Sequence, residues 1–290
     1  MRAWQLVLFC PRSGLALSAY EARSLLELAR RGGGRAVVDL GRKRVDVVIE
    51  SGALLVGSLH LRVDELERVV EEEDAVFFFE KGSPGVKVAF YRCGRYYKLR
   101  CVGKGLAPTL EISGIHMHNI TGTDPWSDAK KKIELVSPGK GDLVLDVCTG
   151  LGYTAVNAVE LGAEVVSIEK DPTVLEIAEF NPWSRGLSNP SVTLLLGDAF
   201  EVVEDLPEGL FDAAVHDPPR FSLAGELYSL EFYRRLRKVL KKGARLFHYT
   251  GWPGKHRGLN IQAGVAGRLR AAGFRIIKAV KGYGLLAEAV

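Results

Sequence analysis

The sequence predicts an α/β protein with a doubly wound parallel sheet, preceded by a smaller α+β module. From about residue 143 onward, short apolar runs alternate with helical segments, which is typical of a parallel sheet covered by helices on both faces. A glycine-rich turn at residues 150–152 separates the first such run from the first helical segment. Residues 1–110 lack this rhythm. We therefore expect an accessory, substrate-recognition module at 1–110 and a cofactor-binding domain at 111–290.

Seven apolar runs of the second part are predicted strands, and five segments between them are predicted helices. Pro172 suits the first turn of a helix, because its missing N–H needs no partner there. Gly162 and Gly273 lie where helices should end in a left-handed residue. The predicted strands are residues 143–147, 164–168, 192–196, 211–215, 245–249, 274–280 and 285–290. The predicted helices are residues 153–161, 172–180, 199–205, 225–240 and 260–271.

The first 110 residues contain a different mixture of elements. The apolar start, residues 1–10, is a predicted strand, since Pro11 and Arg12 end it too early for a signal peptide. A helix over residues 19–31 ends at Gly32, and a second helix is expected over residues 63–72. The remaining predicted strands form a hairpin, residues 36–40 and 45–50, and a three-stranded meander, residues 76–80, 86–92 and 96–102.

The composition is that of an ordinary globular protein, with 47% hydrophobic and 26% charged residues and a net charge of +4. No apolar run approaches the ~18 residues of a membrane helix, so we expect a cytoplasmic protein without a membrane partner. Cys93 and Cys101 could form a bridge, but no pair of cysteines has metal-ligand spacing, and no metal is expected. Glutamine occurs only at Gln5 and Gln262, which favours a thermophile as the source.

Acidic residues follow three successive predicted strands. In the run Asp146-Val-Cys-Thr-Gly150-Leu-Gly152, the carboxylate suits a ligand with a cationic ammonium group, whereas it would repel a dinucleotide pyrophosphate. Glu169 can accept both ribose hydroxyls, and Asp198 can hold an adenine amino group. One such acid alone would be read as a helix cap, but three together predict a nucleoside cofactor. The predicted cofactor-binding residues are Asp146, Thr149, Gly150, Gly152, Tyr153, Glu169, Lys170, Asp198, Ala199 and Asp217.

The run His216-Asp217-Pro218-Pro219-Arg220 follows the fourth predicted strand. Its prolines remove two N–H donors and leave acceptors, the Asp217 carboxylate and the Pro218 carbonyl. Two acceptors can orient the lone pair of a substrate –NH2 group toward the sulfonium methyl of S-adenosylmethionine, and they stabilise the positive charge that develops on nitrogen. We therefore expect Asp217, Pro218 and Pro219 to form the catalytic loop of a methyltransferase. His216 could orient Asp217, act as a base or be structural.

Residues 144–290 resemble the class I S-adenosylmethionine-dependent methyltransferases. The resemblance implies a seven-stranded Rossmann-like sheet whose last strand inserts antiparallel beside the fifth. Asp217-Pro218-Pro219 is similar to the (Asp/Asn/Ser)-Pro-Pro-aromatic motif of members that methylate exocyclic amines of bases or glutamine amides. An aromatic side chain stacks on the substrate in those members. This chain instead has Arg220 followed by Phe221, and either can stack on a base, so both are predicted to bind substrate.

The whole chain, including His216 to Ser222 and the earlier run from Gly114 to Asn119, is similar to a group of archaeal methyltransferases. This likeness extends to enzymes that make N4-methylated cytidine in small-subunit ribosomal RNA, which implies RNA as the partner and S-adenosylmethionine as the cofactor. His116 and His118 lie in the earlier run. We expect them to pack within the fold or to contact substrate, since a metal pair would lack a third ligand. Further candidate RNA contacts are the cations at residues 42–44 and 255–257.

Other interpretations stay open. An Asp-Pro-Pro-Arg string also occurs in RNA uracil-C5 methyltransferases, which need a cysteine nucleophile. No cysteine follows Cys148, which itself lies in the cofactor loop, so this chemistry is not favoured. The acceptor could instead be a protein side chain or a small amine. A third hypothesis is an inactive nucleoside- or RNA-binding module, against which the intact Asp146, Glu169 and Asp217 argue.

Overall fold

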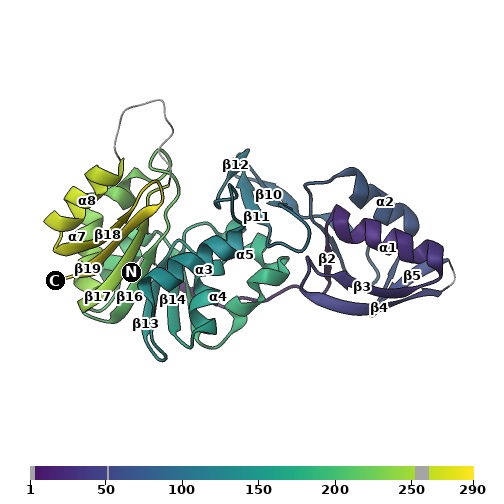
Figure 1. Ribbon diagram of the computed structural model, residues 1–290, viewed down its shortest axis with the longest axis horizontal. Coiled ribbons are helices and arrows are strands. Elements are labelled where there is room, and N and C mark those ends of the chain that lie inside the picture. Colours follow the sequence, from purple (N-terminus) through teal and green to yellow (C-terminus); the bar gives the residue numbers. More distant parts are fainter. Residues whose placement is uncertain (1–3, 51, 252–260) are drawn as a thin grey trace. The chain divides into compact units, whose positions relative to one another are not determined.

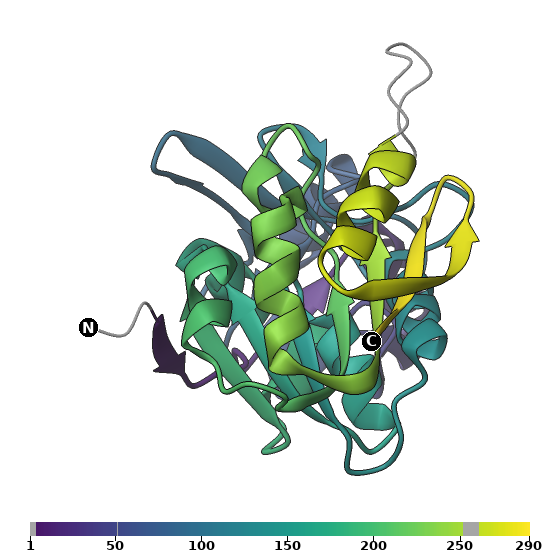
Figure 2. The same ribbon diagram turned by 90° about the vertical axis from the view of Figure 1, so that its left-hand side faces the viewer.

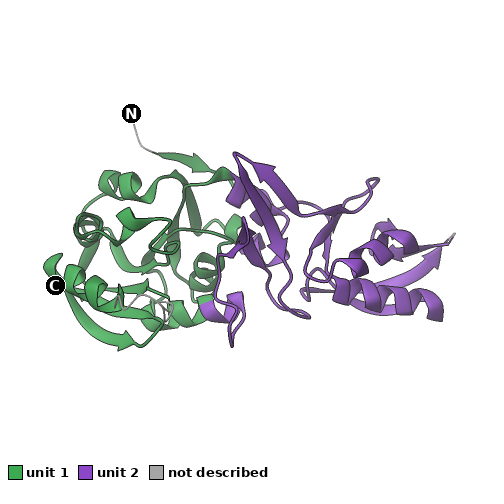
Figure 3. Ribbon diagram, turned by 90° about the horizontal axis from the view of Figure 1, so that it is seen from above, with its two compact units in different colours: residues 1–8, 129–172, 187–290 green, residues 9–128, 173–186 purple. Residues whose placement is uncertain are grey.

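The computed structural model describes residues 4–50, 52–251 and 261–290, which divide into two compact units (Figure 3). The C-terminal unit comprises residues 1–8, 129–172 and 187–290, and the N-terminal unit comprises residues 9–128 and 173–186. These units divide the chain at other positions than the predicted modules 1–110 and 111–290. The functional division into a substrate-recognition part and a cofactor-binding part stays a prediction.

The C-terminal unit is built on an eight-stranded sheet in the order β1-β15-β14-β13-β16-β17-β19-β18 (Figures 1 and 2). Strands β13 to β17 run parallel, whereas β1, at one edge, and β19 are antiparallel to their neighbours. The strands are β1 (Trp4–Val7), β13 (Leu143–Val147), β14 (Glu164–Glu169), β15 (Val192–Gly197), β16 (Phe211–His216), β17 (Leu240–Tyr249), β18 (Phe274–Val280) and β19 (Gly284–Ala289). The helices are α4 (Tyr153–Glu160), α6 (Ala199–Asp205), α7 (Leu230–Val239), α8 (Ile261–Ala271) and the 3-10 helix η2 (Gly225–Tyr228).

This sheet confirms the predicted fold class, including a last strand, β19, that pairs antiparallel with the fifth parallel strand, β17. Two predictions are corrected. The strand at the start of the chain exists, but it pairs with β15 in the large sheet instead of joining the N-terminal module. The predicted helix 225–240 is two helices, because Ser229 stands between η2 and α7 and its hydroxyl accepts the Phe232 N–H at 3.0 Å as an N-cap.

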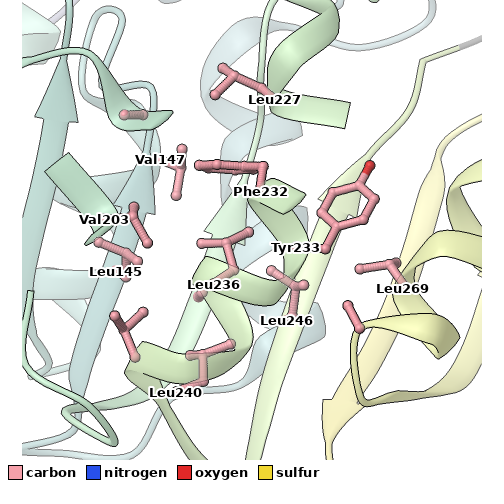
Figure 4. Close-up of a cluster of buried hydrophobic side chains, with 14 of the residues drawn as sticks. Leu145, Val147, Val203, Leu227, Phe232, Tyr233, Leu236, Leu240, Leu246 and Leu269 are labelled. Carbon is pink, nitrogen blue, oxygen red and sulfur yellow. The ribbon is translucent and has the colours of Figure 1, made fainter. Parts of the chain in front are cut away.

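Helices α6, α7 and α8 pack together on one face of this sheet and form its main hydrophobic core (Figure 4). Phe232 and Leu236 on α7 are fully buried against sheet residues such as Leu145 and Leu246. The apolar residues of α7 recur at helical spacing and face the sheet, while its arginines lie on the other side. Burial of this stripe holds the helices that follow β15, β16 and β17 against the sheet.

The N-terminal unit contains three small sheets. Helix α1 starts with a capping box in which the Glu21 carboxylate accepts the Ser18 N–H at 2.9 Å, and it ends at Gly32 in the left-handed conformation, as predicted. The sheets have the orders β3-β4-β5-β6, β2-β7-β8 and β12-β11-β10-β9. Their strands are β2 (Leu15–Leu17), β3 (Gly34–Val38), β4 (Lys43–Glu50), β5 (Ala53–Val56), β6 (Leu59–Leu61), β7 (Phe77–Phe79), β8 (Val86–Lys87), β9 (Ala89–Arg92), β10 (Arg95–Arg100), β11 (Thr109–Ile112) and β12 (Ile115–His116). The helices are α1 (Ala19–Arg31), α2 (Val63–Glu71), α5 (Pro172–Glu179) and the start of α3 (Pro125–Val136).

The predicted hairpin around residues 41–43 is confirmed by the antiparallel pairing of β3 with β4. The two antiparallel pairings of the predicted meander are confirmed, but its middle strand is divided at Val88 into β8 and β9. Strand β8 pairs with β7, which also pairs with β2, whereas β9 and β10 belong to a separate sheet with β11 and β12. Among the described residues, no helix has the length and apolar character needed to cross a membrane.

Replacing Leu236 with alanine tests the core. Leu236 is 0% exposed, so we expect Leu236→Ala to lower the free energy of unfolding by roughly 2–5 kcal/mol, through lost apolar burial and the cavity left behind. Leu161→Ala is the control, because Leu161 is 49% exposed and its loss should cost less than about 0.5 kcal/mol. Urea denaturation of both variants measures the difference. Equal losses would contradict the assignment of α7 to the core.

Candidate functional site

Four acidic residues lie at the carboxyl ends of four adjacent parallel strands. Asp146 and Glu169 stand at the ends of β13 and β14, and Asp198 and Asp217 directly follow β15 and β16. These strands are neighbours in the order β15-β14-β13-β16, so the four carboxyl groups share one edge of the sheet. From β13 the chain continues to β14 and β15 on one side and returns to β16 on the other. Open α/β sheets bind ligands at such a switch point.

The loop between β13 and α4 turns through three residues with positive φ: Cys148 at 75°, Gly150 at 55° and Gly152 at 77°. A side chain at Gly152 would collide with Leu187, since an added Cβ would lie 2.5 Å from its methyl groups. At Gly150, in contrast, an added Cβ would meet no atom within 4 Å. The loop is therefore packed against the protein at one glycine and open at the other, as the backbone of a ligand-binding turn must be.

Asp146 supports this loop from inside the protein. The carboxylate is 1% exposed, and its two oxygens accept hydrogen bonds from the Thr154 hydroxyl at 2.7 Å and the Ser167 hydroxyl at 2.6 Å. The Ser167 hydroxyl also lies 2.6 Å from that of Thr149 in the loop. Burial raises the pKa of Asp146 to about 7. This carboxyl group joins β13, β14 and α4 at the cost of desolvating a charge.

Glu169 holds the loop from the next strand. One carboxylate oxygen accepts the Gly150 N–H and the other accepts the Asp171 N–H, each at 2.9 Å. Burial raises the pKa of Glu169 to about 7 as well. Each carboxylate oxygen has two lone pairs, so both retain acceptor capacity for hydroxyl groups of a ligand.

The remaining predicted cofactor residues lie nearby in the same unit. Asp198 caps α6, because one oxygen accepts the Phe200 N–H at 2.9 Å, and its other oxygen pairs with the Lys170 ammonium at 2.5 Å. Ala199 and Tyr153 are buried in the first turns of α6 and α4. The helix-cap reading of Asp198 is thus correct, although a cap at a strand end can also face a ligand.

A lysine that the sequence did not single out meets Asp217. The Lys132 ammonium, on α3, donates to the Asp217 carboxylate at 2.5 Å and lies 4.3 Å from the ring centroid of Tyr249. The Lys132 side chain is only 4% exposed, against 23% for Asp217. Three consecutive lysines occupy residues 130–132, and nothing in that run distinguishes the buried one. Its position 85 residues before Asp217 gives no local signal either.

The loop after Asp217 is also held in place. The Tyr228 hydroxyl donates to the Pro219 carbonyl at 2.9 Å, and burial raises the pKa of Tyr228, so this group remains a donor. Phe221 is 49% exposed, and its ring packs edge-on against Tyr228 at 5.4 Å. Arg220 is exposed beside it. Arg220 and Phe221, both predicted to contact substrate, thus have side-chain surface exposed to solvent.

His216 lies in the interior of the C-terminal unit. It is completely buried, and its Nε2 lies 2.9 Å from the Leu227 carbonyl oxygen. Burial lowers the pKa of His216 to about 4, so the imidazole is neutral near pH 7. A neutral donor bonded to a backbone carbonyl fixes the loop that follows, and this favours packing over the base role considered for it.

His116 and His118 lie in the N-terminal unit, at β12 and just after it. His118 Nδ1 is 3.0 Å from the Thr109 hydroxyl and accepts the Leu110 N–H at 3.4 Å, while His116 Nε2 is 3.3 Å from the Glu111 carboxylate.

No group of three metal-ligating side chains occurs among the described residues, and all four cysteines are free thiols, so the possible Cys93–Cys101 bridge is absent. The cations at 255–257 lie outside the described residues.

Comparison with known proteins shows which relatives the chain has. No family model matches the chain. It is 47% identical to uncharacterized protein MJ1233 of Methanocaldococcus jannaschii over 219 residues, which are 75% of this chain and 74% of that protein. It is 35% identical over 85 residues to a putative ribosomal RNA large subunit methyltransferase, MJ1649, of the same organism, covering 29% of this chain and 22% of that protein. It is 31% identical over 106 residues to the 23S rRNA (uracil(1939)-C(5))-methyltransferase RlmD of a Shewanella species, covering 36% of this chain and 22% of that protein.

The chain therefore belongs to the family of MJ1233, whereas it spans less than a quarter of the length of MJ1649 and of RlmD. Among solved structures, a spermidine synthase in complex with the transition state analogue AdoDATO has a TM-score of 0.57 at 17% identity, covering 69% of this chain and 72% of that chain. The spermidine synthase of Thermotoga maritima has a TM-score of 0.54, also at 17% identity, covering 69% and 71%. Together with the strand order, this likeness shows that the C-terminal unit has a Rossmann-like α/β fold.

The buried Asp146 gives a test through stability. Its folded pKa of about 7 exceeds its ordinary value of 3.8, so the folded state holds an extra proton between these values and loses stability as the pH rises toward 7. Asn mimics the neutral form. Asp146→Asn should match the wild type at about pH 3, below both pKa values, and melt roughly 2 °C or more higher at about pH 8. Thermal denaturation at both values measures this, and a variant that is less stable at the higher pH would contradict the pKa.

Proposed function

We propose that this member of the MJ1233 family transfers a methyl group from S-adenosylmethionine to an exocyclic amino nitrogen of a base in RNA, with N4 of a cytidine in ribosomal RNA as the specific acceptor. Methyl transfer from S-adenosylmethionine is supported by the matched ribosomal RNA methyltransferases. One observation supports the amino acceptor above the others. The Asp217 carboxylate, followed by two prolines, is held by Lys132 at the switch point of the sheet, next to the glycine loop.

The residues at this edge suit the cofactor. S-adenosylmethionine carries a cationic ammonium, a sulfonium, a ribose diol and an adenine amino group, and it supplies an already activated methyl group. Glu169 would accept the ribose hydroxyls, and Asp198 would accept from the adenine amino group. Asp146 would favour the ammonium end and keep the loop at residues 148–152 in its open form. The open side of Gly150 provides room for the ligand beside the backbone.

The chemistry assigned to the chain's own residues is positioning and charge stabilisation. The Asp217 carboxylate and the Pro218 carbonyl would accept the two N–H groups of the acceptor amine, which points its lone pair away from them. As nitrogen gains positive charge, the same two acceptors stabilise it, and Asp217 is placed to receive the proton that the methylated amine must release. The side chain of Phe221, or that of Arg220, would stack on the base.

Lys132 and Tyr228 act as positioning residues in this scheme. The Lys132 ammonium fixes the Asp217 carboxylate through a short ion pair, and the Tyr228 hydroxyl fixes the Pro219 carbonyl. Because both ends of the loop are fixed, the loop loses less conformational entropy when the acceptor amine binds. Displacement of a reacting group by about 1 Å can cost roughly 100-fold in rate, so these contacts matter although neither touches the methyl group.

The thiol chemistry supports nitrogen over carbon as the acceptor. RlmD methylates uracil C5, and that reaction needs a thiolate nucleophile. No cysteine follows Cys148 in the sequence. Burial raises the pKa of the Cys148 thiol well above its ordinary value, which leaves little thiolate for nucleophilic attack. An RNA acceptor is supported by the names of the matched ribosomal RNA methyltransferases, each aligned over about a third of this chain.

A methyl-transfer assay tests the proposal. Purified protein, radiolabelled S-adenosylmethionine and separate RNA and protein fractions from cells lacking this gene would be incubated together. We expect label in ribosomal RNA that digests to N4-methylcytidine. Label only in protein or small amines would move the acceptor to the second hypothesis. Cofactor binding without transfer to any fraction would favour the inactive binding module.

Asp217→Ala should lower the kcat of methyl transfer by more than about 100-fold. It should change cofactor affinity by less than about threefold. The reason is that Asp217 is assigned to the acceptor amine, whereas Glu169 and Asp146 are assigned to the cofactor. Asp146→Asn should show the opposite pattern, with weakened cofactor binding measured by calorimetry. Full activity of Asp217→Ala would remove the catalytic assignment.

Lys132→Met should lower kcat by roughly 10- to 100-fold with little change in cofactor affinity, because the Asp217 carboxylate loses the ammonium that positions it. Lys132→Arg should restore part of the rate, since it keeps the charge. Lys131→Met is the matched control, because Lys131 is next in sequence and also contacts an aromatic ring, Tyr283 at 4.4 Å, without pairing with Asp217. Equal losses in both methionine variants would argue for a general effect on α3.

A further inference from the structure

Two tryptophans and an arginine stack in the N-terminal unit, in a place that the proposed chemistry does not use. Trp126, in the first turn of α3, and Trp183, in the 3-10 helix η1 (Pro182–Ser188), have ring centroids 5.3 Å apart at an interplanar angle of 56°. The Arg42 guanidinium lies 4.6 Å from the Trp183 ring and 5.9 Å from the Trp126 ring. Both indoles are half-buried and Arg42 is exposed, so the stack reaches the surface.

The backbone that carries Arg42 is held in an uncommon conformation. Asp39, Leu40 and Gly41 have successive positive φ angles of 60°, 50° and 87°. Gly41 approaches another chain segment so closely that an added Cβ would lie 2.7 Å from the Gly105 backbone. The Leu40 carbonyl accepts the Trp183 indole N–H at 3.0 Å. Left-handed non-glycine residues cost free energy and persist only where surrounding contacts impose them, so Arg42 is presented on a rigid turn.

The Asp39 side chain holds this turn in place from the protein interior. It is completely buried, and its carboxylate accepts the Ala16 N–H at 3.1 Å and pairs with the Arg185 guanidinium. Arg185 belongs to the same 3-10 helix as Trp183. The negative charge at the turn is therefore compensated inside the protein and does not oppose an anion outside it.

Cations without acidic partners surround the stack. Arg42, Lys43 and Arg44 are consecutive and exposed, and none of the three forms an ion pair within the part of the chain that the structure describes. Lys104, also exposed, precedes the glycine that contacts Gly41. Partly exposed aromatic rings beside several cations without acidic partners are the features by which proteins hold single-stranded nucleic acid, through base stacking and phosphate contacts.

We propose that Trp126, Trp183 and the cations Arg42, Lys43 and Arg44 form a binding surface for a single-stranded segment of the RNA substrate; this proposal rests on the proposed RNA acceptor. We call these five residues the Trp–Arg surface. Unpaired bases present faces that can stack on an indole or a guanidinium, whereas the bases of a duplex are covered by their neighbours. The three cations can contact successive phosphates of such a segment. The surface thus selects unpaired RNA by shape and charge without reading its sequence.

The test uses the full-length protein and two labelled probes: an oligouridine of about 12 nucleotides and an RNA duplex of about 12 base pairs, within the size range of single-strand sites. The wild type should bind the oligouridine more tightly than the duplex. The triple variant Arg42→Gln, Lys43→Gln, Arg44→Gln should bind the oligouridine roughly tenfold or more weakly. The dependence of log affinity on log salt should fall by about 2, at about 0.7 per lost phosphate contact.

A charge-matched variant and an aromatic variant complete the test. Arg30→Gln, Arg31→Gln, Lys81→Gln removes the same charge from exposed positions of the same unit and should leave the affinity within about threefold of the wild type. Trp126→Leu should weaken oligouridine binding with the salt dependence unchanged, because it removes stacking alone. Where circular dichroism shows that the tryptophan variant is unfolded, the triple charge variant decides, since its side chains are exposed.

The outcomes separate the two proposals. Loss of oligouridine binding in the triple variant but not in the control supports the Trp–Arg surface. Unchanged binding and unchanged ribosomal RNA methylation in the triple variant overturn the Trp–Arg surface while the proposed function stands. Equal losses in the triple variant and the control also overturn it, since only general charge would then matter. Wild-type protein that methylates no RNA refutes the proposed function, and wild-type protein that does not bind oligouridine refutes the Trp–Arg surface.

Discussion

The burial of Asp146 and Glu169 is the constraint on which the C-terminal unit depends. Removing a carboxylate from water is costly, and the raised pKa of each group expresses that cost. The structure offsets part of it with hydrogen bonds from Thr154 and Ser167, and from the N–H groups of the glycine loop and of Asp171. These contacts join β13, β14 and α4 at the edge where the chain changes direction across the sheet. In the proposed function, a cationic, hydroxyl-bearing cofactor at this edge would offset more of that cost.

The position of Asp217 depends on a second charged group, the Lys132 ammonium, which is distant in the sequence. In the proposed reaction, Asp217 must be exposed enough to reach an amine and yet remain in one position. The nearly buried Lys132 ammonium, with the Tyr249 ring beside it, provides that position. Lysine on an aromatic face gains from the ring's negative potential, which compensates for some of its lost hydration. The Tyr228 hydroxyl fixes the proline loop, so the aromatic residues behind Asp217 serve the site through packing.

The family relationship and the site carry different information. The long match with MJ1233 identifies relatives of the chain but names no reaction. The shorter matches with methyltransferases cover about a third of this chain, and those proteins act on different atoms or leave the atom unnamed. Our proposal of an amino nitrogen therefore rests on Asp217, the two prolines and the raised pKa of the Cys148 thiol. The choice of unpaired RNA comes from the Trp–Arg surface, which lies in the other unit.

The sequence by itself determined the alternation of strands and helices, the glycine turn and the acids at the strand ends. These features are local, because helical periodicity, apolar runs and the φ freedom of glycine act within a few residues. It did not reveal that the first strand pairs with β15, that the expected meander divides between two sheets, or that Lys132 meets Asp217. Only the tertiary structure decided these, since residues far apart in the chain become neighbours through the packing of whole elements. The stack of Arg42 on Trp126 and Trp183 belongs to the same class, and no local pattern encodes it.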